Sequence, residues 1–189
     1  MICSTHNYDF LIVSSPYKTS ERSTMYHEFT PCAALAPFID KFWVFKGFTD
    51  IGTCFKILAD GCTDFIFSIG NMTVPTDEHS MIMQPYRSYF VGPMRVYSDL
   101  TATTNTLHML GVRFHPCGLA AFTNEPLGQF ADLRIQSSDI NLLFDNAFAE
   151  MLCEQPDDSV RIRIIEGYLI RLLTQSIQVD RQIIYATSF

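Results

Sequence analysis

The stretch LADGCTDFIFSIGN, residues 58–71, combines a turn signal with an almost unbroken apolar run. Asp60 and Gly61 suit a two-residue turn that needs positive φ, and alternating Phe and Ile residues lie on both sides of it. The pattern predicts a β-hairpin with its tip at these two residues. Asp64 is the only charge after the turn, so we expect both faces of the second strand to be covered.

Outward from this stretch, the first half of the chain is strand-like and the second half is helical. Turn signals about 8–12 residues apart are typical of an all-β sandwich or barrel. After residue 115 the apolar period changes to that of helices. The predicted fold class is therefore α+β, with a barrel-like N-terminal part and a small helical C-terminal part. Strands are expected at 8–15, 26–31, 42–47, 81–84, 88–91, 94–99 and 105–115, and helices at 115–124, 137–153 and 156–177.

Composition limits the possible partners of the protein. Of the 189 residues, 48% are apolar and only 17% are charged, which is fewer than the roughly 25% of an average soluble domain. This excludes disorder and suggests that a partner subunit or a further part of the chain covers some of the surface. The net charge is −7 and the 13 Lys and Arg residues are scattered. As it stands, the chain is poorly suited to bind nucleic acid.

The six cysteines form no CxxC pair and have no His partner at metal-ligand spacing. The sequence shows no signal peptide, and no window approaches the ~18 apolar residues of a membrane span. We therefore expect free thiols in a cytoplasmic protein that does not enter a membrane.

Catalytic motifs are sparse. The five His residues form no HxH pair, and there is no GxSxG and no phosphate-binding glycine loop. Cys117 lies two residues after His115, but an inert thiol is the simpler interpretation. We expect no enzyme, no metal and no cofactor.

The strand-to-helix stretch HMLGVRFHPCG, residues 108–118, offers a binding site. Arg113 and His115, together with the free amides of a helix N-terminus, could bind the anionic group of a small ligand. The structural alternative is that Arg113 neutralises Asp60 or Asp64 on a neighbouring strand, as half-buried Arg residues usually have a protein partner.

Aromatic residues provide further ligand-binding candidates. Trp43, Phe67 and Tyr97 could line a cavity inside a barrel. The alternative is that they belong to an ordinary core. Trp43 and Tyr97 are the stronger candidates because their polar groups need partners when they are buried.

The predicted helix 156–177 is apolar over more than one narrow face, which indicates packing on two sides. One side would contact its own domain and the other a second copy of the chain. The candidate residues for this dimer interface are Tyr168, Leu169 and Leu172.

Five motifs occur in an order that resembles the N-terminal regulatory domain of AraC-type transcriptional regulators. The hairpin departs from the group's usual Leu-Pro-Asp-Gly-Cys pattern only at Ala59, which replaces the proline. The resemblance covers roughly residues 25 to 175. The motifs are LAPFIDKFWVF (35–45), ILADGCTDFIFSIG (57–70), YFVGP (89–93), LGVRFHPCGLAAF (110–122) and PLGQFADLRI (126–135).

The resemblance implies a cupin-like β-barrel or jelly-roll sensor at 1–115 and a helical linker and dimerisation part at 116–178. Residues 179–189 would then begin a helix-turn-helix domain that continues beyond this chain and binds DNA. The implied function is ligand sensing and dimerisation, with an unknown small-molecule effector and a homodimeric, cytoplasmic protein. The alternative is a stand-alone cupin-like small-molecule-binding protein or enzyme.

Overall fold

The computed structural model describes residues 25–57, 59–69, 76–77, 82–140 and 143–186. The predicted strand at 8–15 lies outside these residues. The strands are β1 (Met25–Phe29), β2 (Ile39–Phe48), β3 (Cys54–Ile57), β4 (Thr63–Ser68), β5 (Thr76–Asp77), β6 (Ser88–Val91), β7 (Ser98–Thr101), β8 (Thr106–Phe114) and β9 (Arg134–Gln136). The helices are α1 (Asn146–Cys153) and α2 (Asp158–Ala186).

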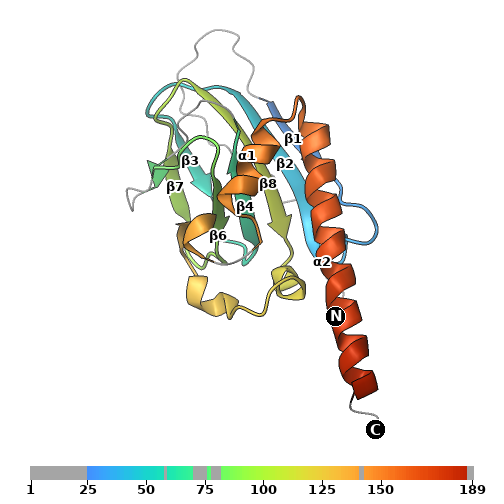
Figure 1. Cartoon of the computed structure of the whole chain (residues 1–189). Coiled ribbons are helices and arrows are strands. Elements are labelled where there is room, and N and C mark those ends of the chain that lie inside the picture. The colour runs from blue at the N-terminus through green and yellow to red at the C-terminus, as the bar shows by residue number, and fades with distance from the viewer. Residues whose placement is uncertain (1–24, 58, 70–75, 78–81, 141–142, 187–189) are drawn as a thin grey trace.

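Two antiparallel sheets form the β part (Figure 1). Six strands pair in the order β1-β2-β8-β4-β6-β9, and three others pair in the order β3-β7-β5. The α+β prediction is therefore confirmed. The prediction of a closed barrel is not met, because within the described residues β1 and β9 stay at opposite edges of the larger sheet.

One face of the larger sheet is apolar because the apolar side chains of neighbouring strands are paired and point to the same side. Phe42 pairs with Val112, Val112 with Phe65, and Phe65 with Phe90, so these side chains share a face. We call it the core face. It also carries Val44, Phe67, Leu110 and Phe114, and each of these apolar residues is at most 3% exposed.

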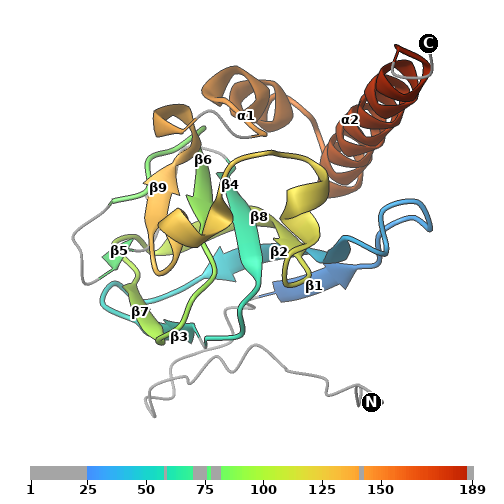
Figure 2. The ribbon, with the colours of Figure 1, turned by 90° about the horizontal axis from the view of Figure 1, so that it is seen from below.

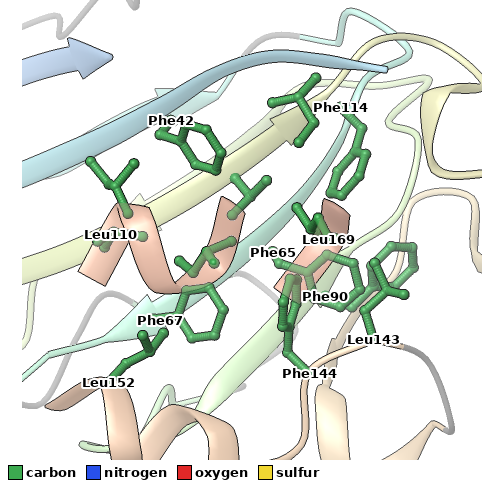
Figure 3. Packing of buried hydrophobic residues seen from close by; sticks show 14 of the residues in the cluster. Phe42, Phe65, Phe67, Phe90, Leu110, Phe114, Leu143, Phe144, Leu152 and Leu169 are labelled. Carbon is green, nitrogen blue, oxygen red and sulfur yellow. The ribbon is translucent and has the colours of Figure 1, made fainter. Parts of the chain in front are cut away.

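Both α-helices cover the core face. Leu169 of α2 and Leu152 of α1 pack against it together with Leu143 and Phe144 from the segment that precedes α1 (Figure 3). Phe144 lies edge-on to Phe65, with ring centroids 5.0 Å apart. The C-terminal part of α2 extends beyond the end of the sheet (Figure 1). No helix among the described residues is long and apolar enough to cross a membrane.

The hairpin predicted around Asp60 and Gly61 is wrong. The turn itself exists: Gly61 has φ +71°, and the Cys62 amide donates a 2.9 Å hydrogen bond to Asp60 Oδ1. However, β3 pairs with β7, whereas β4 pairs with β6 and β8. The turn therefore leads from one sheet into the other. Within the larger sheet, β4 lies between β6 and β8. Such an inner strand can be apolar on both faces, which explains the apolar run that follows the turn.

The predicted helices differ from the structure mainly in length. The helix expected at 137–153 begins only at Asn146, because Leu143 and Phe144 first enter the core and Asp145 then caps the helix. Its Oδ1 accepts a 2.8 Å hydrogen bond from the Phe148 amide. The helix expected at 115–124 is a 3₁₀ helix of four residues, Gly118–Ala121. In contrast, α2 continues to Ala186, well past the predicted end at residue 177.

Candidate functional site

The larger sheet has a second face, which points away from α1 and α2 (Figure 2). We call it the helix-distal face. Six of its residues keep 5–9% of their surface exposed, whereas Ser68, Tyr89 and Leu107 on the same face keep at most 1%. Solvent therefore reaches only part of this face, around these six residues. The six residues are Trp43, Phe45, Ile66, Val91, Met109 and Arg113.

Trp43 lies flat against the backbone of β8. Its cross-strand partner is Gly111, and a Cβ added to that glycine would lie 2.0 Å from Trp43 Cε2. Any side chain at position 111 would therefore collide with the indole. The absence of a side chain also lets Trp43 reach over β8 to the next strand, where its Nε1 donates a 3.0 Å hydrogen bond to Asp64 Oδ1.

Asp64, near the start of β4, is the acid of this face. Its Oδ2 lies 3.8 Å from Arg113 Nη1, and Arg113 Nη2 also contacts Asp60 Oδ2. Burial raises the pKa of Asp64 to about 7, although the hydrogen bond from Trp43 opposes the shift. Burial also lowers the pKa of Arg113. The carboxyl group of Asp64 can therefore change its charge near neutral pH.

A second ion pair borders the first. Lys41 Nζ lies 2.7 Å from Glu28 Oε1 and 3.7 Å from Asp40 Oδ2. Tyr26 donates a 3.0 Å hydrogen bond to the same Glu28 oxygen, and its ring stacks near Trp43 with centroids 6.4 Å apart. Burial and the neighbouring Glu28 raise the pKa of Tyr26. Both aromatic rings therefore lie beside carboxylates.

Cys62 lies at the edge of the same cluster. Burial and the nearby Asp64 raise the pKa of its thiol to about 11. The thiol stays protonated at neutral pH, so a nucleophilic role is disfavoured.

The structure brings together some of the sequence-derived candidates. Trp43 and Arg113 lie on the helix-distal face with Asp64, and Asp60 contacts Arg113. Arg113 thus has the two acidic partners that its strand position suggested.

The other ligand-binding candidates lie elsewhere. Phe67 is fully buried on the core face, against Phe144. Tyr97 is 58% exposed in the segment between β6 and β7. The His115 amide donates to the Phe38 carbonyl at 3.0 Å, which places the backbone of His115 at the end of β8. The 3₁₀ helix that follows is too short to form an anion site at its N-terminus.

The candidate dimer residues contact their own domain. Leu169 is fully buried in the core, so its side chain is not available to a second copy. Tyr168 donates a 2.7 Å hydrogen bond to the Leu143 carbonyl, and Leu172 is partly buried against the core. The exposed side of α2 instead carries Arg163, Ile170 and Arg171, and Ile170 is 38% exposed.

Sequence reasoning missed a buried polar contact between β8 and α2. His108 Nε2 lies 3.0 Å from Asp158 Oδ1, and Arg161 Nη1 donates to the same oxygen at 2.5 Å. Arg161 also donates to the Leu152 and Gln155 carbonyls at the end of α1. The available signal was strand alternation, because His108 has the parity of the core-face residue Leu110 and so points towards the helices.

Among the described residues, no three His, Cys, Asp or Glu side chains are grouped so that they could hold a metal ion. Cys32, Cys62, Cys117 and Cys153 are free thiols.

A family model described as a domain of unknown function (DUF6597) matches residues 27–136. The match begins within β1 and ends at the last residue of β9, so it contains nearly all of the larger sheet, including the helix-distal face. Both α-helices lie outside it. No curated protein matches the chain.

Proposed function

Since the chain belongs to the DUF6597 family of domains of unknown function, we propose a function from its own residues: ligand sensing and dimerisation in an AraC-type transcriptional regulator. DNA would be bound by a further domain rather than by these residues, and the protein would act as a cytoplasmic homodimer. The five ordered motifs support the regulator type. The two sheets would form an open, cupin-like sensor.

The observation that carries the proposal is that β4 and β8 each carry site residues on one face of the larger sheet and core residues on the other. Asp64 and Arg113 lie on their helix-distal face, whereas Phe65 and Leu110 on the same strands contact the core beneath the helices. A ligand that moves the first pair would therefore displace the packing against α2. Because α2 extends beyond the sheet, it can pass this change to whatever follows it (Figure 1).

A reporter fusion tests this proposal in cells. The C-terminal end of the chain is joined to a helix-turn-helix domain that binds its operator only as a dimer, and operator occupancy is measured with a reporter gene. The fusion should occupy the operator, whereas the helix-turn-helix domain alone should not. A folded fusion that performs no better than the isolated domain would overturn the proposed dimerisation and regulator function.

A further inference from the structure

The helix-distal face has polar groups at both ends and an apolar floor between them. Asp64 and Ser68 lie four residues apart on β4, about 13 Å at the rise of a β-strand, and Ile66 lies between them on the same face. Ser68 is fully buried, and its Oγ has no hydrogen-bond partner among the described residues. Because an unsatisfied buried hydroxyl destabilises the fold, a ligand with a hydrogen-bonding group would gain by meeting it.

The charges near Asp64 favour a cation over an anion. Around this end of the face lie four carboxylates and three cations. Lys41 pairs with Glu28 and Asp40, and Arg113 pairs with Asp60 and Asp64, so these two cations have acidic partners. An anionic ligand would have to displace these carboxylates. The carboxylates are those of Glu28, Asp40, Asp60 and Asp64, and the cations are Lys41, Arg113 and Arg134.

The aromatic rings favour the same class of ligand. Tyr26 and Trp43 stack beside Glu28 and Asp64, so ring faces and carboxylates occur together. This combination binds organic ammonium groups, through the ring quadrupole and through charge-assisted hydrogen bonds. Ile66 and Met109 supply apolar surface next to it.

We propose that the helix-distal face binds a small organic cation with an aromatic or apolar body, with its ammonium group at Asp64 and its far end towards Ser68. This inference rests on the proposed function, since it names the ligand class of the same sensor. It also replaces the anion that Arg113 and His115 suggested from the sequence.

Three matched probes test the ligand class: tyramine, which is cationic, tyrosol, which is neutral, and 3-(4-hydroxyphenyl)propionate, which is anionic. Trp43 is the only tryptophan of the chain and donates to Asp64, so its fluorescence reports binding directly. Tyramine should bind at least about tenfold more tightly than the other two probes, as expected for a charge-assisted contact. Isothermal calorimetry gives the same dissociation constants without the fluorophore.

Variants test the position of the ligand. Asp64→Asn keeps the shape of the side chain and should weaken tyramine binding by about tenfold or more, with little effect on tyrosol. Glu28→Gln, at a more exposed carboxylate of the cluster, should weaken tyramine in the same direction without risk to the fold. Glu125→Gln, at an exposed residue outside the site, should leave all three affinities unchanged. Circular dichroism verifies folding.

The outcomes separate this inference from the proposed function. Equal or tighter binding of the neutral or anionic probe would overturn the cation class, although ligand sensing would survive. If no probe binds the folded protein, the inference also fails. Neither outcome affects the reporter fusion, which needs no probe and decides the regulator function independently.

Discussion

Asp64 is an acid on a strand that is otherwise apolar, and its contacts explain how the fold tolerates it. Trp43 supplies one hydrogen bond, Arg113 lies 3.8 Å away, and 14% of the side chain remains exposed. These contacts compensate only part of the cost of burying a charge, so the pKa rises from 3.8 to about 7. Asp64 is therefore a titratable group on an inner strand of the larger sheet.

This shift predicts a pH-dependent contribution to stability. Because the folded pKa lies above the unfolded value, the protonated acid adds stability below about pH 4 that is lost as the pH rises through about 7. Relative to Asp64→Asn, the wild type should lose up to about 1.4 kcal/mol per pH unit over this range. Urea unfolding of both proteins at a series of pH values measures the difference. A difference that stays constant with pH would contradict the shifted pKa.

Position 111 requires a glycine, because the Trp43 indole occupies the space that a side chain there would need. Gly111→Ala should move the indole, break its hydrogen bond to Asp64 and cost about 1–3 kcal/mol of unfolding free energy. Gly128→Ala is the control, because a Cβ there meets nothing within 4 Å, and it should stay within about 0.5 kcal/mol. Denaturant unfolding and the emission of Trp43 report the two effects. Equal stability of both variants would show that the indole can move without cost.

At the scale of elements, Arg161 connects both helices to each other and, through Asp158 and His108, to β8. Arg161→Ala removes these donors from a site where Arg161 is only 6% exposed, so it should cost about 3–5 kcal/mol. Arg163→Ala, at an exposed position two residues later, should change stability by less than about 0.5 kcal/mol. Thermal and urea unfolding measure both. Similar losses in the two variants would contradict the role of Arg161 in connecting the elements.

The elements also show what the sequence could predict. Periodicity located most strands of the larger sheet and the beginning of α2, because the buried side chains create the pattern themselves. It could not tell that β3 and β4 belong to different sheets, because a turn signal at Asp60 and Gly61 describes the chain reversal but not the pairing partner. The residues of the site show the same division between what the sequence pattern predicts and what depends on the packing. The contact of Arg113 with Asp64 was suggested by strand neighbours, whereas the bond from Trp43 across Gly111 depends on three-dimensional packing.

At the scale of the whole molecule, the larger sheet separates two environments. On one side, the core face and the helices form an apolar, aromatic cluster, and the other side carries the ion pairs around Asp64 and Arg113. The same arrangement limits where a second copy can bind, because the buried side of α2 is already occupied by its own domain. A homodimer through this helix must use the exposed side that carries Ile170.

The exposed side of α2 can therefore be tested without damaging the core. In the proposed homodimer, Ile170→Glu would place a charge in the interface and should yield monomers with an unchanged circular dichroism spectrum. Ile51→Glu is the matched control, since Ile51 is 65% exposed in a loop between β2 and β3 and should leave the dimer intact. Leu169→Ala should instead cost about 2–5 kcal/mol of stability, because that residue is fully buried within one chain. Size-exclusion chromatography with light scattering gives the masses. A dimer that survives Ile170→Glu would exclude this side of α2 as the interface and leave the surfaces of the two sheets as the place to look for it.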